Sequence, residues 1–189
     1  MPRRLDYGSR GDWVLESLCQ VIPRGGLRAP SVRAVAKEMD LSPSSLLHEF
    51  TDQSRLFRVA AARIGNARLT QVSYRSIEEG LLAFVPRTEH ELEQARASVA
   101  FQELARTDAD IGSVVTDLRN QQRELLERIG RGVLDESGVD ALAALIEGVL
   151  AAMLLTDSPL TAERARAAVV SYAQVLGLPA EAPLFTSAS

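Results

Sequence analysis

The chain has few of the residues from which most catalytic sites are built. Its 189 residues include one cysteine, Cys19, and two histidines, His48 and His90. A single cysteine cannot form an intramolecular disulfide, which favours a cytoplasmic protein. The sequence contains no glycine-rich phosphate loop, nucleophile elbow or CxxC pair. These absences argue against an enzyme, and we expect the chain to need no cofactor.

Long apolar runs and aromatic residues are also scarce. No stretch approaches the roughly 20 apolar residues that span a bilayer, so we expect no membrane segment. The basic N-terminal sequence MPRRLDYGSR is not followed by the apolar region of a secretory signal. Aromatic residues make up 5% of the chain, but apolar residues make up 46%, which is ample for a core. Because helix-forming alanine, leucine, arginine and glutamate dominate and alternating β-branched runs are absent, we predict an all-α fold.

Charge is unevenly divided along the chain. Residues 1–75 contain 12 Arg/Lys and 7 Asp/Glu, a net charge of +5, whereas residues 76–189 contain 9 and 18, a net charge of −9. A basic N-terminal part attached to an acidic remainder is typical of a DNA-binding head on an effector-binding body. Chance clustering is the alternative interpretation of charge alone.

The segment from Gly26 to Phe57 predicts two short helices, a tight turn between them and the start of a longer helix. In the first helix, apolar residues recur at the spacing of one buried face, namely Val32, Val35, Ala36 and Met39. Ser31 is placed to cap this helix, and Ser42-Pro43 is a second helix-start signal. The second helix, Pro43 to Glu49, is too short to be stable without packed neighbours. This is the pattern of a helix-turn-helix, whose second helix enters the DNA major groove.

These residues resemble the DNA-binding head of the TetR (tetracycline-repressor-like) transcriptional regulators. The resemblance rests on Gly26, SVRAVA (31–36), LSPSSL (41–46), Phe50 and the apolar helix that opens with Leu56-Phe57. A weaker likeness, ALIEGVLAAMLL (144–155), is similar to the dimerisation helix of that family.

The resemblance implies an all-α homodimer with two parts. Residues 1–52 would form a three-helix DNA-binding head, and residues 53–189 a helical effector-binding and dimerisation domain. The protein would be a transcriptional repressor that binds a palindromic operator in double-stranded DNA. A small, apolar effector would release it from that operator. The two recognition helices of the dimer would then lie roughly one turn of DNA apart, about 34–36 Å.

The residues that we expect to contact DNA lie mostly on the two short helices. They are Ser31, Arg33, Lys37, Ser42, Pro43, Ser44, Ser45 and His48. Hydroxyl and imidazole groups can bind base edges or phosphates, and helix N-termini attract anions. Arg3, Arg4 and Arg10 form either an arm for the minor groove or a basic tail.

Three positions depart from the pattern of the family. Asp40 stands where glycine is usual in the turn, Leu47 replaces a tyrosine of the recognition helix, and Gln53 replaces a phosphate-binding lysine. A second hypothesis follows: a TetR-like dimer with weakened or lost DNA binding that acts through ligand or protein contacts.

The remainder predicts further helices, of which the last two are candidates for the dimer interface. We expect helices over 12–22, from 52 past 69 and as far as 74, over 76–85 and 88–105, from 108 or 110 to 129, and over 139–155 and 161–176. The helix over 139–155 is apolar on more than one face, so a second subunit would cover part of it. The expected interface residues are Leu142, Ile146, Val149, Leu150, Met153, Ala165, Val169, Tyr172 and Leu176.

Ligand-binding residues are harder to distinguish from core residues. The candidates for an effector pocket are Phe84, Phe101, Leu104, Val114, Leu118, Gln122, Leu125 and Met153. The competing class, a helical-bundle enzyme or carrier, would use His90 and Glu93 as metal ligands on one helix face. A di-metal bundle needs a second such pair, and the sequence offers no further histidine for it.

Overall fold

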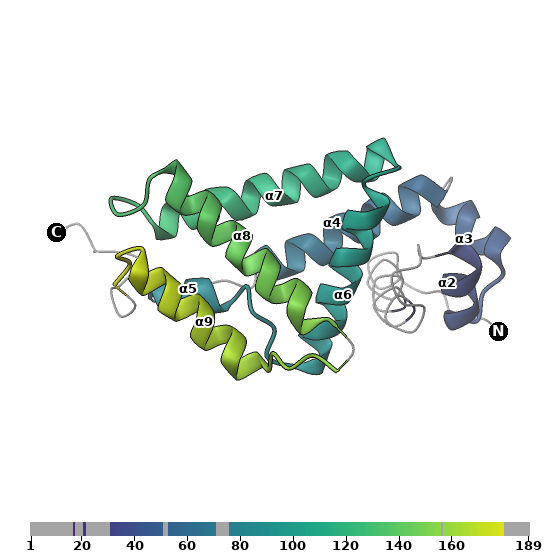
Figure 1. Ribbon diagram of the computed structural model, residues 1–189. Helices are drawn as coiled ribbons and strands as arrows, with labels where there is room; N and C mark the ends of the chain where they lie inside the picture. Colours follow the sequence, from purple (N-terminus) through teal and green to yellow (C-terminus); the bar gives the residue numbers. More distant parts are fainter. Residues whose placement is uncertain are drawn as a thin grey trace. The chain divides into compact units, whose positions relative to one another are not determined.

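The computed structural model describes residues 17, 21, 31–50, 53–70, 76–155 and 157–179. Within these ranges the chain forms eight helices and matches the all-α prediction (Figure 1). The helices are α2 (Val32–Glu38), α3 (Pro43–Phe50), α4 (Gln53–Thr70), α5 (Ile77–Leu82), α6 (Glu89–Leu104), α7 (Ala109–Ile129), α8 (Glu136–Met153) and α9 (Ala162–Val175). The helix predicted over 12–22 lies outside the described residues except for Ser17 and Val21, which are both helical.

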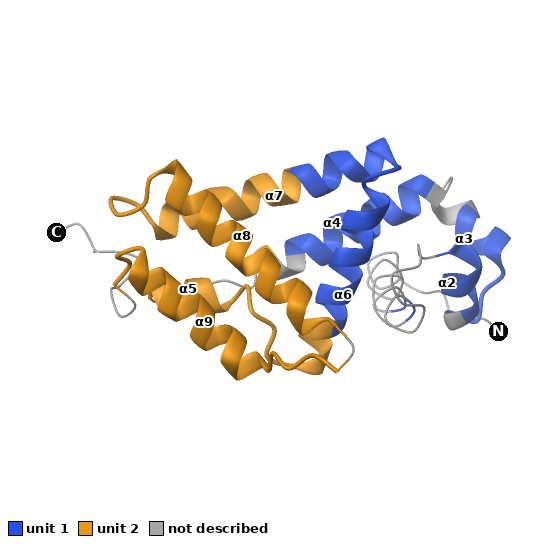
Figure 2. Cartoon of the chain, in the orientation of Figure 1, with its two compact units in different colours: residues 1–66, 93–116 blue, residues 67–92, 117–189 orange. Residues whose placement is uncertain are grey.

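The chain divides into two compact units (Figure 2). The first unit comprises residues 1–66 and 93–116, and the second comprises residues 67–92 and 117–189. Helices α4, α6 and α7 each contribute residues to both units. The first unit therefore contains most of α4 and α6 and the start of α7 in addition to α2 and α3. The functional division predicted at residue 52 stays a prediction.

The first unit has one continuous apolar core. Its buried residues come from α2, α3, α4, α6 and the start of α7, and they include Val35, Met39, Leu46, Leu56, Ile64, Phe101 and Ile111. The rings of Phe57 on α4 and Phe101 on α6 lie 6.4 Å apart at a tilt of 59°, a favourable geometry for an aromatic pair. The two short helices are thus held by longer ones, as expected for helices too short to be stable alone.

The second unit has its own core. Residues of α5, α7, α8 and α9 are buried together, including Leu81, Leu126, Leu142, Ile146, Ala165 and Val169. Helix α9 packs against both α8 and α5. The end of α9 is closed by Gly177, at φ 83°, and by Leu178, which is buried in the same core.

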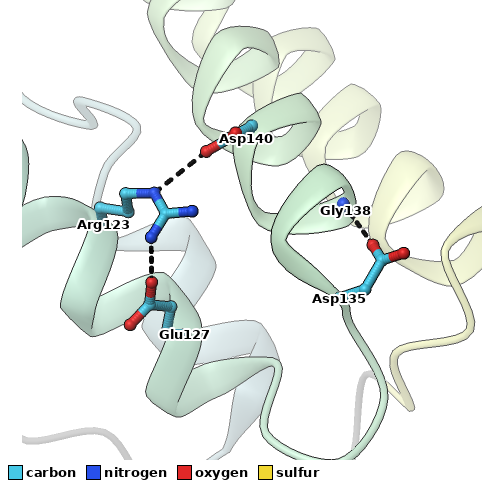
Figure 3. A network of polar contacts seen from close by, with 5 residues as sticks. All are labelled: Arg123, Glu127, Asp135, Gly138 and Asp140. Carbon is cyan, nitrogen blue, oxygen red and sulfur yellow. Dashed lines mark hydrogen bonds and ion pairs between the residues drawn. The ribbon is translucent and has the colours of Figure 1, made fainter.

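Polar contacts on the surface of the second unit join α7 to α8 (Figure 3). The Arg123 guanidinium donates from Nε to Asp140 Oδ1 at 3.0 Å and also pairs with Glu127 one turn further along α7. The hydrogen bond to Asp140 raises the pKa of Arg123 above its ordinary value. Nearby, Asp135 caps α8 by accepting a hydrogen bond from the Gly138 N–H at 2.8 Å.

The caps explain where the helices begin. The predicted capping residue Thr88 accepts from the Glu91 N–H at 3.2 Å, and α6 begins at the next residue. Helix α8 starts three residues before the predicted Val139, because Asp135 supplies the cap and Gly138 is tolerated in the first turn.

Candidate nucleic-acid interface

Helix α2 presents two cations on the side opposite its buried face. Ser31 has an extended backbone and its hydroxyl accepts from the Ala34 N–H at 3.1 Å, which confirms the predicted cap. The four residues of the predicted apolar face are buried. Arg33 and Lys37 are exposed and lie one helical turn apart. A cap, an anchored face and two cations on one side give α2 a fixed basic surface.

The turn between α2 and α3 explains the departure at Asp40. Leu41 N–H donates to the Ala36 carbonyl at 2.8 Å and Asp40 N–H donates to the Lys37 carbonyl at 3.2 Å. This pair of bonds is the Schellman motif, whose C′ residue adopts the left-handed conformation and is usually glycine. Asp40 has φ 52°. Aspartate is one of the few residues other than glycine that occasionally adopt this conformation, so the turn keeps its shape without glycine.

Helix α3 begins with a cluster of serine hydroxyls. Ser42 Oγ accepts from the Ser45 N–H at 3.0 Å and lies 2.9 Å from Ser44 Oγ and 2.7 Å from Ser45 Oγ. Ser42 therefore caps α3. Pro43 is the first helical residue, and all four side chains of this turn are exposed. The hydroxyls of Ser44 and Ser45 are the groups that this end of α3 offers to a partner.

The inner face of α3 holds the helix in place. Leu46 is completely buried, and Leu47 is half-buried against the same core. Leu47 therefore acts as a packing residue at the position where the resembling family has tyrosine.

Two arginines at the start of α4 were not identified from the sequence. Arg55 and Arg58 are both exposed, three residues apart on the helix that follows α3. They share a side because residues three apart are neighbours on a helix. The signal that could have revealed them is the apolar spacing of Leu56, Phe57 and Ala60, which places both arginines on the outer side.

Exposed cations from α2 and α4 and hydroxyls from α3 are therefore gathered on one compact unit. Cations bind phosphates without reading sequence, whereas hydroxyls can bind either phosphates or base edges. Four of the expected DNA-contacting residues cannot be placed: Arg3, Arg4, Arg10 and the His48 side chain lie outside the described residues.

The expected pocket residues belong to different cores. In the first unit, Phe101 is buried and Leu104 and Val114 are half-buried against the core. In the second unit, Phe84, Leu125 and Met153 are buried, and Leu118 and Gln122 are half-buried. The pocket stays a prediction.

Most of the expected interface residues are covered by their own chain. Leu142, Ile146, Val149, Leu150, Met153, Ala165 and Val169 are buried in the single chain, and Tyr172 and Leu176 are half-buried. The same two helices expose another set of residues, most of them too small to stand out in the apolar pattern of the sequence. These are Ala144, Gly148, Ala151 and Leu155 along α8 and its end, and Ala168, Ser171 and Val175 on α9.

The two residues considered as metal ligands lie on the surface of α6 or partly within it. His90 is exposed and Glu93 is half-buried on α6. Among the residues that the structure describes, no three His, Cys, Asp or Glu side chains are grouped so as to hold a metal ion. None of the helices in the described ranges combines the length and the apolar character needed to cross a bilayer.

Comparison with known proteins supplies the context for this geometry. No model of a known protein family matches the chain. The chain is 23% identical over 190 residues to the HTH-type transcriptional regulator PksA of Bacillus subtilis (strain 168), covering 92% of this chain and 93% of PksA.

Solved structures resemble the chain over nearly its whole length. A transcriptional regulator from Rhodococcus sp. Rha1 superimposes with a TM-score of 0.78 at 20% identity, over 88% of this chain and 95% of that one. A protein from Rhodococcus sp. named as a TetR-family transcriptional regulator gives a TM-score of 0.71 at 19% identity, over 89% and 98%. The multidrug binding protein EbrR, complexed with ethidium, gives 0.61 at 19% identity, over 86% and 98%. This chain therefore has the all-α fold of the TetR-type transcriptional regulators.

Proposed function

We propose that this protein is a DNA-binding transcriptional regulator of the TetR type, and that α2 and α3 form its DNA-binding surface. The observation that carries the proposal is the capped helix-turn-helix with Arg33 and Lys37 exposed on α2 and hydroxyls exposed at the start of α3. The shared fold and the likeness to a helix-turn-helix regulator support it. The regulator acts in the cytoplasm, needs no cofactor and is not an enzyme.

The working form is a homodimer joined through α8 and α9. In support, the exposed residues Ala144, Gly148 and Ala151 form an outward line of small residues along α8. Leu155, just after the helix, is 66% exposed. Val175 on α9 is 79% exposed. A Cβ atom added at Gly148 would meet nothing within 4 Å in the single chain, so a second copy has room to approach closely. Small residues with two large apolar ones suit helix-on-helix packing between identical chains.

The dimer represses transcription from a palindromic operator until a small apolar molecule binds the body. Because EbrR was solved in complex with ethidium, a flat aromatic cation, flat aromatic molecules, with and without a positive charge, are sensible first probes. A ligand that prefers a different spacing of the two heads shifts the population away from the DNA-binding arrangement.

A second candidate function is a TetR-like dimer that acts through ligand or protein contacts with little DNA binding. The observation that favours it is Leu47, which packs against the core and brings no hydroxyl to the DNA surface. Gln53 adds to it, since this position carries no charge.

Binding to a nonspecific duplex over a series of salt concentrations separates the two. A DNA-binding regulator loses affinity steeply, because each phosphate contact releases a counterion and contributes about −0.9 to the slope of log K against log salt. The variants Arg33→Ala and Lys37→Ala should each reduce that slope by about 1. Arg131→Ala, an exposed arginine of the second unit, is the matched control and should leave it unchanged. Weak binding that responds neither to salt nor to Arg33 would favour the second candidate.

A further inference from the structure

A carboxylate from α7 lies against the basic start of α4. Asp110 Oδ2 accepts a hydrogen bond from Ser54 Oγ at 3.4 Å, and the same oxygen lies 4.0 Å from Arg58 Nη1. All three residues belong to the first unit. One of the cations that α4 could offer to a phosphate is thus already beside an anion of its own chain.

The position of Asp110 is fixed by its neighbours. Asp108 caps α7 by accepting from the backbone N–H groups of Asp110 at 3.0 Å and Ile111 at 3.1 Å. Ile111 is buried in the first core. The carboxylate of Asp110 is therefore not needed as the cap, and the backbone that carries it is anchored.

The contact itself is weak enough to be exchanged. The side chains of Arg58 and Asp110 are 47% and 63% exposed, and both distances are long for their kind. Exposed ion pairs of this kind contribute little to stability. Arg58 can leave Asp110 at little cost when a stronger anion is offered.

A DNA phosphate is such an anion. Arg58 shares an exposed side of α4 with Arg55, and two residues separate the end of α3 from the start of α4. The N-terminus of α4 also attracts anions over its first turn, which contains Arg55. Arginine also binds phosphate through paired donors, a stronger geometry than its single long contact with Asp110.

We propose that Arg58 is a phosphate-binding residue of the DNA surface, and that Asp110 competes with the phosphate for its guanidinium. The proposal rests on the proposed function, since it requires that this unit bind DNA. Arg58 supplies a positive charge on α4, where Gln53 stands in place of the phosphate-binding lysine that is usual in the family. Asp110 acts as an internal brake that lowers affinity for any duplex, whatever its sequence.

The test is a double-mutant cycle of duplex binding with Asp110→Asn, Arg58→Ala and the two combined. Asp110→Asn should bind duplex about two- to fivefold more tightly at low salt, because one competing anion is removed. Arg58→Ala should weaken binding and reduce the salt slope by about 1. In the Arg58→Ala background, Asp110→Asn should give little gain.

Asp117→Asn is the matched control, since it makes the same charge change at an exposed position two turns further along α7. If the asparagine variant folds poorly, Asp110→Ser takes its place, since serine also removes the carboxylate and is favoured near the start of a helix. Circular dichroism of each variant checks that it is folded.

Three results would overturn the inference. A gain from Asp110→Asn that is equal with or without Arg58, or equal to that of Asp117→Asn, would be a general effect of charge. No gain, with Arg33→Ala still weakening binding, would reject the brake and leave the proposed function standing. Wild-type protein that shows no salt-dependent binding would reject both together.

Discussion

The two units bury similar residues but expose different ones. Each has a core of leucine, isoleucine, valine, alanine and phenylalanine from several helices. On α2, α3 and α4 of the first unit the outward residues include arginine, lysine and serine, whereas α8 and α9 of the second unit expose lines of alanine, glycine and large apolar side chains. The cores account for folding. The outward faces are the basis of the two proposals, that the first unit binds an anion and that the second unit binds a second copy of the chain.

The largest effect is expected from placing a charge on the outward line of α8, which tests whether this surface is the dimer interface. Ala151→Arg is tolerated in the single chain, where Ala151 is exposed, but it would bury a charge in the proposed dimer interface. We expect monomers in analytical ultracentrifugation. Affinity for a palindromic duplex should fall about 10²- to 10⁴-fold, because two linked heads bind more tightly than one.

The matched control is Ala83→Arg, the same change at an exposed alanine at the end of α5. It should leave both the oligomeric state in ultracentrifugation and the affinity for the palindromic duplex as in the wild type. If Ala151→Arg sedimented as the wild-type dimer does, the α8 and α9 surface would not be the interface.

A finer comparison concerns two helix ends, one in each unit. Both α2 and α9 end in a Schellman motif: Leu41 N–H bonds to the Ala36 carbonyl at 2.8 Å, and Leu178 N–H bonds to the Ala173 carbonyl at 2.9 Å. The left-handed residue is Asp40, at φ 52°, in the first case and Gly177, at φ 83°, in the second. The same left-handed conformation is thus adopted by glycine, which accepts it without strain, at the end of α9. At the end of α2 it is adopted by aspartate, which accepts it at some cost.

Substitutions at these two positions should therefore change the free energy of unfolding in opposite directions. Gly177→Ala should destabilise the protein by about 1 kcal/mol, since alanine is strained at positive φ. The added Cβ would lie 3.6 Å from Val133 Cγ1, an ordinary contact, so strain and not a clash is the cause. Asp40→Gly should stabilise by about 0.5 kcal/mol, because it removes strain and a negative charge at a helix C-terminus.

Urea unfolding followed by circular dichroism measures both changes. Asp40→Asn keeps the tolerance for positive φ and removes only the charge, so it separates the two causes. Equal effects of Gly177→Ala and Asp40→Gly, in the same direction, would contradict this account of the turns.

Local patterns predicted local structure well. The spacing of Val32, Val35, Ala36 and Met39 predicted the buried face of α2, and Ser31 was identified as its cap; the structure confirms both. The start of α8 was predicted too late, at Val139, because Asp135 was not identified as the capping residue.

Long-range relations were beyond the sequence. The spacing of apolar residues shows that a face is buried but not which helix covers it, so the share of α6 and α7 in the first core could not be predicted. For the same reason, the apolar residues of α8 were assigned to a dimer interface although α5, α7 and α9 cover them. The contact of Arg58 with Asp110 could not be predicted, because the two residues are 52 positions apart in the sequence.

The most direct test of the central claim is selection of bound sequences from a randomised duplex pool. Wild-type protein is compared with an Arg33→Ala/Lys37→Ala variant and with Ala151→Arg. We predict that the wild type enriches a palindrome whose half-site centres lie about one helical turn apart, about 10–10.5 base pairs. Neither variant should enrich it. Failure of the folded, dimeric wild type to enrich any sequence would contradict the claim that this chain is a sequence-specific DNA-binding regulator.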